Sequence, residues 1–252
     1  MPQTIQMFGI EGMPEVRAGD DLAALIVEAA KRQKLAIQDG DILVVTQKVV
    51  SKAEGRVVRL SAVEPSPLAL RWAEAYGRDP RHVEVILRES RRIIRMERGI
   101  IVSETRHGFK CANAGVDASN LPEEGTVSLL PEDPDASAER IRSGVRARLG
   151  AEVAVVVSDT FGRPWREGAT NVAVGVAGLN PLKDYRGGTD PYGRPLRTTV
   201  IAVADELAAA AELATNKVTR VPVALIRGYD YQQTEQAGAR ALIRPPEQDL
   251  FP

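Results

Sequence analysis

The sequence predicts an α+β fold. Apolar, β-branched runs that suit strands are interspersed with segments whose apolar residues recur at helical spacing. These segments follow one another without a regular strand–helix–strand rhythm, which favours α+β over a doubly wound parallel sheet. The 252 residues are 44% hydrophobic and 27% charged, enough to bury a core in one domain or in two closely packed halves. We therefore expect an ordered chain.

The first elements follow from local patterns. Residues 3–10 alternate like a strand, and Gly-Met-Pro-Glu at 12–15 makes a turn. The apolar residues of 21–34 fall at helical spacing, which predicts a helix. A strand is expected over 42–45, with the polar motif Thr-Gln-Lys, residues 46–48, at its end.

The middle of the chain predicts two helices, over 67–76 and 81–89. A basic segment, 91–95, follows, and then a strand near 99–104. The three arginines of the basic segment interrupt apolar residues. They are either a phosphate-binding cluster or partners of acidic helices.

The last part of the chain begins with an amphipathic helix over 135–149, opened by Pro134 and ended by Gly150, as helix punctuation predicts. The β-branched run 153–157 is expected to be a buried strand. The remaining predicted elements are strands over 172–176, 198–203 and 221–226 and an alanine-rich helix over 205–214.

Asp159 and Thr160 follow the run 153–157 directly. A carboxylate and a hydroxyl that emerge together at the carboxyl end of a strand suit a hard divalent cation. The alternative is that they are turn residues or helix caps, which is the commoner use of Asp and Thr after a strand.

A second acidic loop, residues 111–120, contains Asp117 among small residues that allow a ligand close to the backbone. Asp117 is expected either to join Asp159 on a metal or to serve a tight turn. Lys48 and Lys52 bracket a turn after a strand, where their ammonium groups either bind phosphate or remain solvated.

Two other residues leave alternatives open. His107 either binds a substrate anion or shuttles a proton, or it is an ordinary turn histidine. Trp165, between two arginines, either stacks on a planar ring or is a half-buried core residue.

Composition excludes several classes of function. Lys plus Arg number 33 against 34 for Asp plus Glu, so the net charge of -1 gives no field that would attract nucleic acid or an anionic membrane. A single cysteine, Cys111, and two histidines argue against a disulfide and a structural zinc site. No signal sequence or spanning segment is found, which predicts a cytoplasmic protein.

The sequence lacks the P-loop motif, the glycine-rich dinucleotide-binding motif and the nucleophile-elbow motif of α/β-hydrolases. The residues themselves therefore predict a metal-assisted enzyme that acts on a phosphate-bearing substrate.

Taken together, several ordered motifs resemble the coenzyme F420-0:L-glutamate ligase family, and the resemblance covers nearly the whole chain. A single motif of this kind is weak evidence for a family, but the order of several motifs along the chain makes the resemblance specific. The motifs lie at residues 12–15, 19–22, 49–56, 106–109, 112–120, 158–166, 190–196 and 204–213.

The resemblance implies one ligase domain over residues 1–252, built of two interlocked α+β subdomains, without the nitroreductase-like domain that some relatives carry. It also implies a homodimer with the nucleotide site near the dimer interface. The implied reaction joins L-glutamate to the phospholactyl carboxylate of F420-0 and converts GTP to GDP and phosphate. Mg²⁺ or Mn²⁺ and K⁺ are the implied ions.

The resemblance further implies roles for individual residues. Lys48, Lys52 and Asp159 are expected to be catalytic, and the expected metal ligands are Asp117, Asp159 and Thr160. The expected nucleotide contacts are Gly12, Met13, Pro14, Glu15, Gln47, Lys48, Lys52 and Asn120.

Two positions depart from the family pattern. A Ser-Thr pair of the family is Gln47-Lys48 here, and a metal ligand after the alanine-rich helix is Lys217, which puts a second metal in question. Two rival functions therefore remain, a non-catalytic deazaflavin or nucleotide binding protein and a metal-dependent nucleotide phosphohydrolase. Dependence on glutamate separates the three.

Overall fold

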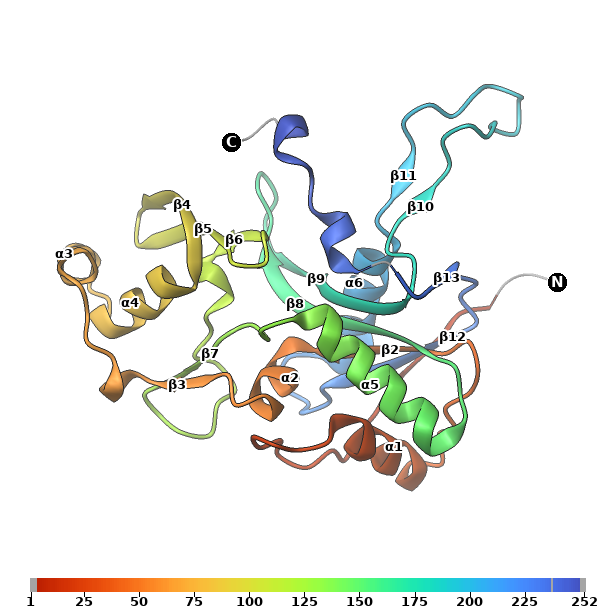
Figure 1. The fold of residues 1–252 in the computed structure, drawn as a ribbon, viewed down its shortest axis with the longest axis horizontal. Coiled ribbons are helices and arrows are strands. Elements are labelled where there is room, and N and C mark those ends of the chain that lie inside the picture. Colours follow the sequence, from red (N-terminus) through yellow and green to blue (C-terminus); the bar gives the residue numbers. More distant parts are fainter. Residues whose placement is uncertain (1–3, 237, 250–252) are drawn as a thin grey trace.

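A computed structural model describes residues 4–236 and 238–249 of the chain. Its centre is a six-stranded mixed sheet (Figure 1). Only β2 and β8 are parallel, and the other neighbouring strands are antiparallel. In spatial order the strands are β1 (Gln6–Gly9), β12 (Val223–Arg227), β2 (Ile42–Thr46), β8 (Ala154–Gly162), β9 (Ala169–Leu179) and β13 (Gln233–Thr234). The predicted α+β class is confirmed.

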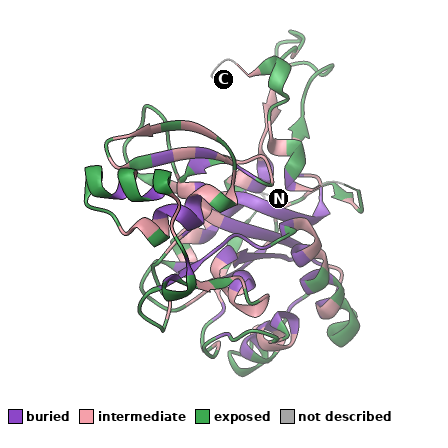
Figure 2. Cartoon of the chain, turned by 60° about the vertical axis from the view of Figure 1, so that its left-hand side comes forward, coloured by how far each residue is buried: buried purple, intermediate pink, exposed green. Residues whose placement is uncertain are grey.

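Helices cover both faces of this sheet. Along β2, Leu43 and Val45 face the helices α1 (Leu22–Arg32) and α5 (Pro134–Leu149), whereas Ile42 and Val44 face α6 (Val203–Thr215). Successive side chains of a strand point to opposite faces, so one continuous apolar run supplies both cores. Figure 2 shows this buried sheet in the middle of the molecule.

A smaller part of the molecule has its own core and lies on the left in Figure 1. The chain enters it through β3 (Val57–Arg59) and returns through β7 (Thr126–Ser128), and these two strands pair with each other. The core is closed by two helices and a three-stranded sheet. These elements are α3 (Pro67–Tyr76), α4 (Pro80–Glu89), β4 (Ser90–Glu97), β5 (Ile100–Thr105) and β6 (Lys110–Ala112).

The ends predicted for the helix over 135–149 are confirmed by its caps. The Asp133 side chain accepts a hydrogen bond from the Ala136 N–H at the start of α5, and Gly150 ends that helix with a positive φ of 69°. Ser66 caps α3 in the same way, with Pro67 in its first turn.

The strand that carries Asp159 and Thr160 is longer than predicted. It does not end at Val157 but pairs with β9 as far as Gly162, after a register shift between Val157 and Ser158. Asp159 and Thr160 therefore lie within a strand, and the alternative in which they serve as turn residues or helix caps is wrong. The apolar run stops earlier because these side chains line a polar pocket, not the core.

Other elements also differ from the prediction. The helix α2 (Gln47–Ala53) begins directly after β2, and the basic segment 91–95 lies in strand β4. The predicted strand over 198–203 is reduced to β11 (Val200–Ile201), because α6 begins at Val203. Residue 3 of the first predicted strand lies outside the described residues.

β11 pairs with β10 (Lys183–Asp184) at the base of an arm that stands away from the body in Figure 1.

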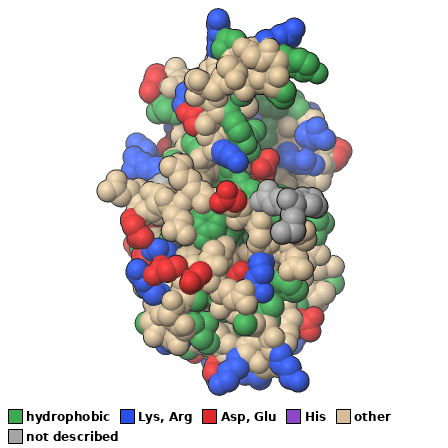
Figure 3. All heavy atoms as spheres, turned by 90° about the vertical axis from the view of Figure 1, so that its right-hand side faces the viewer, with side chains coloured by type: hydrophobic (Ala, Val, Ile, Leu, Met, Phe, Trp, Pro, Cys, Tyr) green, Lys and Arg blue, Asp and Glu red, His purple; other side chains and the backbone are tan. Residues whose placement is uncertain are grey.

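Within the part of the chain that the structure describes, no helix is both long and apolar enough to cross a membrane. Acidic and basic side chains are interspersed on the face in Figure 3, and their numbers in the chain are nearly equal. Short 3-10 turns lie at Leu60–Ala62, Asn113–Gly115, Ala239–Leu242 and Pro246–Gln248.

Candidate active site

A pocket of about 660 Å³ lies between the smaller part of the molecule and one end of the central sheet. Its walls come from segments that are distant in the sequence. They are the turn at residues 13–16, the start of α2, the loop 115–122, the polar end of β8 and the segment 212–222 that joins α6 to β12. The fold thus brings the predicted acidic and basic motifs together.

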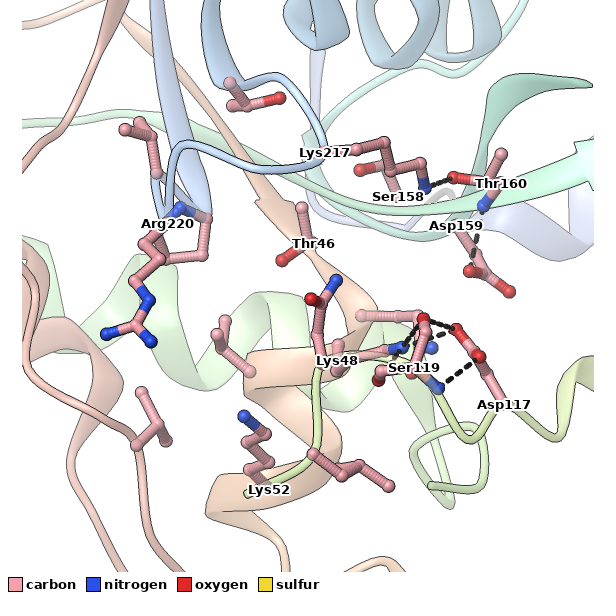
Figure 4. Close-up of a pocket in the computed structure, with 18 of the residues that line it drawn as sticks. Thr46, Lys48, Lys52, Asp117, Ser119, Ser158, Asp159, Thr160, Lys217 and Arg220 are labelled. Atoms are coloured by element: carbon pink, nitrogen blue, oxygen red, sulfur yellow. Dashed lines mark hydrogen bonds and ion pairs between the residues drawn. The ribbon is translucent and has the colours of Figure 1, made fainter. Parts of the chain in front are cut away.

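Lys48 and Asp117 form an ion pair in this pocket, and the Lys48 ammonium also donates to the Ser119 carbonyl at 2.6 Å (Figure 4). The Ser119 N–H and hydroxyl both donate to the Asp117 carboxylate, at 2.7 and 2.8 Å. Burial alone would raise the pKa of Asp117, but the hydrogen bonds from Lys48 and Ser119 lower it below its usual value. Asp117 is therefore anionic at neutral pH.

Asp159 lies beside this pair, and its environment has the opposite effect. Loss of solvation raises the pKa of Asp159 to about 6, although the Thr160 N–H donates to one carboxylate oxygen at 2.8 Å. The negative charge of Asp117 adds to the rise, while Lys48 and Lys217 oppose it. The protein alone therefore compensates this carboxylate incompletely.

Thr160 belongs to a chain of hydrogen bonds that crosses the hairpin formed by β8 and β9. Thr160 is paired with Asn171 in register, and its hydroxyl donates to the Asn171 side-chain oxygen at 2.7 Å. The Asn171 amide donates in turn to Glu212 of α6 at 2.9 Å. The ammonium of Lys217 donates to the Thr160 hydroxyl. Lys217 thus places its charge on the predicted metal ligand.

The other predicted nucleotide contacts have different positions. Lys52 pairs with Glu15 at 2.5 Å, and both line the pocket together with Met13, Pro14 and Asn120. Gln47 also lines it, but its side chain is buried and accepts from the Ser51 hydroxyl at 2.8 Å. Gly12 is not among the lining residues; its carbonyl accepts from Arg32 at 2.9 Å.

Three other candidates lie outside the pocket lining. The arginines of the basic segment pair with acidic residues of their own sheet, among them Arg91 with Glu104 at 3.3 Å. Of the two interpretations of this segment, phosphate binding or pairing with acidic residues, the structure supports pairing. The acidic partners lie on strands and not on helices. His107 contacts the carbonyl of Pro131 at 2.9 Å, and Trp165 is 81% exposed. Trp165 is therefore not a half-buried core residue.

The carboxylates fit a cation that arrives with a phosphate ligand. Among residues 4–236 and 238–249, no group of three or more His, Cys, Asp or Glu side chains is arranged to hold a metal ion. Mg²⁺ bound with a nucleotide needs fewer protein ligands, since one or two carboxylates and the phosphate oxygens complete its shell. Asp117, Asp159 and the Thr160 hydroxyl are oxygen donors of that kind on one side of the pocket.

Comparison with known proteins gives the family. The family model described as F420-0:Gamma-glutamyl ligase matches residues 11–228. The chain belongs to this family. It is 52% identical over 249 residues to the coenzyme F420:L-glutamate ligase of Methanothermobacter thermautotrophicus, and the match covers 98% of both chains.

Two further members of the family are also similar over nearly their full length. The coenzyme F420:L-glutamate ligase of Methanopyrus kandleri is 47% identical, with 96% of each chain covered. That of Methanocaldococcus jannaschii is 40% identical, with 98% of this chain and 96% of the relative covered. Residues 11–228, which the family model matches, include every predicted site residue of this chain.

Sequence reasoning missed several pocket residues. Ser119 lay within a motif that was recognised, but its own contacts were not foreseen. Asn171 had a visible signal, since it is a polar residue in a strand that is otherwise apolar. Glu212 lay within the recognised motif 204–213, but the alanine-rich helix does not show in sequence which side faces a pocket. Arg220 had no such signal.

Proposed function

We propose that the protein ligates L-glutamate to the phospholactyl carboxylate of F420-0 at the expense of GTP. The observation that carries the proposal is the pocket, in which Asp117, Asp159 and three lysines from separate segments converge. Such a set suits phosphoryl transfer to an anionic acceptor. The similarity to proteins named coenzyme F420:L-glutamate ligase supplies the acceptor and the amino acid.

A carboxylate does not react with an amine until one of its oxygens becomes a good leaving group. In the proposed reaction the γ-phosphoryl group of GTP moves to a carboxylate oxygen of F420-0, which releases GDP and forms an acyl phosphate. The neutral amine of glutamate then attacks the acyl carbon. Phosphate leaves, the amine loses a proton, and the amide bond is formed.

The lysines offset charge in this scheme. Lys48 forms an ion pair with Asp117 in the structure. When a cation binds Asp117, the Lys48 ammonium is expected to move away and to donate hydrogen bonds to the neighbouring phosphate oxygens. Lys52 is placed to do the same from the Glu15 side of the pocket, and Lys217 from the Thr160 side. No covalent bond to the protein is needed.

Asp117, Asp159 and Thr160 would hold a divalent cation, Mg²⁺ or Mn²⁺, and K⁺ is proposed as the monovalent ion. The divalent ion would neutralise charge on the transferring phosphoryl group. The incompletely compensated charge of Asp159 supports a cation at this place.

We further propose that the protein acts as a homodimer. Large apolar side chains left exposed on the chain support an interface, among them Tyr192 of the arm and Val218 at the pocket.

Mass spectrometry tests the reaction directly. F420-0 is incubated with pure protein, GTP, Mg²⁺ or Mn²⁺ and L-glutamate, and GDP release is followed in parallel without glutamate. A product heavier by glutamyl units is expected. GDP release without that product would favour the phosphohydrolase, and the absence of both products would favour a binding protein.

A further inference from the structure

Arg220 is a further cation of the pocket, beside its lysines. Its side chain is exposed and lines the pocket, and it makes no hydrogen bond or ion pair with any residue that the structure describes. The three lysines of the pocket differ in this respect, because Lys48 and Lys52 hold carboxylates and Lys217 holds a hydroxyl. The charge of Arg220 is thus available to a ligand.

The backbone at Arg220 has an unusual conformation that sets the direction of the side chain. Its φ is 58°, in the left-handed region that long side chains rarely adopt. The segment is anchored just beyond this residue, because the Thr46 N–H donates to the Pro222 carbonyl at 2.9 Å and the Ile10 N–H to the Val223 carbonyl at 2.8 Å. The packed sheet therefore maintains a strained turn that presents this side chain at the pocket.

Figure 4 shows where the side chain points. The guanidinium extends to the side of the pocket that Lys52 also occupies, and Asp159 and Thr160 lie on the other side of the view. Lys52 is paired with Glu15 of the turn 12–15. Arg220 therefore lies away from the carboxylates that would surround the transferring group.

We propose that Arg220 binds the non-transferred phosphates of the nucleotide. This inference rests on the proposed function, which brings a triphosphate into the pocket. A guanidinium is planar and always charged, and it binds phosphate oxygens through two parallel hydrogen bonds. The F420-0 carboxylate that accepts the γ-phosphoryl group must lie beside that group, which the proposed function places on the Asp159 side, away from Arg220.

Binding measurements with Arg220→Asn test the assignment. Asn tolerates a positive φ, so this variant removes the guanidinium and retains the backbone. Arg220→Lys retains the charge but loses the paired donors. Arg71→Gln is the matched control, because Arg71 is also exposed and forms no hydrogen bond or ion pair with the residues that the structure describes. It lies on α3, outside the pocket lining.

Affinities for GDP, a non-hydrolysable GTP analogue and guanosine are measured with Mg²⁺ by calorimetry or by competition. We expect Arg220→Asn to raise the Kd of both nucleotides about 10- to 100-fold, the size of a charged hydrogen-bonding partner lost. Guanosine affinity and the Tm should not change. Arg220→Lys should lie between the two, and Arg71→Gln should match wild type.

Other outcomes would overturn the assignment. Equal losses for guanosine and GDP would move Arg220 to the base. Unchanged nucleotide affinity with a raised KM for glutamate would move it to the amino acid. Nucleotide binding that depends on Arg220, in a protein that makes no glutamyl product, would instead contradict the proposed function and leave this inference standing.

Discussion

At the scale of single residues, the environment of Asp159 bears on both stability and the proposed binding of a cation. A partly buried carboxylate with a pKa raised to about 6 destabilises the folded protein whenever it is ionised. A carboxylate with poor compensation is, for the same reason, a strong site for a cation. One isosteric substitution tests both properties.

Asp159→Asn is expected to lose turnover and gain stability. The amide retains an oxygen to accept from the Thr160 N–H but cannot supply charge to a cation, so kcat should fall at least about 100-fold. Steady-state ligase assays over a range of Mn²⁺ concentrations measure this. Wild-type activity in the variant would exclude Asp159 as a metal ligand.

The stability gain should depend on pH in a defined window. Below the ordinary pKa of 3.8 the Asp159 carboxyl is protonated in both states, and wild type and variant should be about equally stable. As pH rises towards 6 the unfolded carboxyl ionises first, so wild type loses stability relative to the variant, about 3 kcal/mol at pH 7. Metal-free urea unfolding at pH 4 and pH 7 would detect this, and a difference that is independent of pH would contradict it.

Lys217→Glu should change the metal dependence. The ammonium that donates to Thr160 would be replaced by a carboxylate that attracts cations to the same place. We expect activity to require a different Mn²⁺ concentration from wild type, measured by titration at fixed GTP. Lys217→Met removes the charge without adding a ligand and serves as the control. Identical titrations for wild type and Lys217→Glu would place Lys217 away from the ions.

The sequence predicted the identity of these residues better than their partners. Asp117 and Asp159 were expected to meet, and both line the pocket. The pairing of Lys48 with Asp117 links residues 69 positions apart, and local patterns carry no information on such a contact. Gln47 was expected to contact nucleotide, but its buried bond to Ser51 gives it a structural role as well.

At the scale of elements, helices were predicted more accurately than strands. Caps and prolines mark helix ends locally, as Asp133 and Gly150 do for α5. The extent of a strand depends on its neighbour. β8 continues past its apolar run because β9 pairs with it, and β4 tolerates three arginines because its sheet has an exposed face.

The junction of α5 with β9 depends on a glycine. A Cβ at Gly175 would lie 2.3 Å from the Pro134 carbonyl oxygen at the start of α5. Gly175→Ala should therefore destabilise the protein by about 1–3 kcal/mol, seen as a lower Tm. Gly162→Ala is the control, because a Cβ there would meet nothing within 4 Å. Equal Tm values for the two variants would show that α5 shifts without cost.

At the scale of the whole molecule, the arm between β10 and β11 is the least integrated feature. Its backbone hydrogen bonds join the two sides of the arm to each other, for example Tyr185 N–H to the Thr199 carbonyl at 3.0 Å. Its residues are mostly exposed, and Tyr192 is 87% exposed. A polar, protruding hairpin of this kind gains little stability from the chain that bears it, which favours a role between chains.

We therefore expect a homodimer in which the arm takes part. Light scattering after size exclusion should give about twice the 27.3 kDa of the chain. Replacing residues 185–199 with Asn-Gly closes a two-residue turn beside the paired Asp184 and Val200, so the body should fold unchanged. This variant should be largely monomeric, with an unaltered circular dichroism spectrum. A monomeric wild type would contradict the dimer, whereas a dimeric variant would place the interface elsewhere, with the exposed Leu213 and Val218 as the next surface to alter.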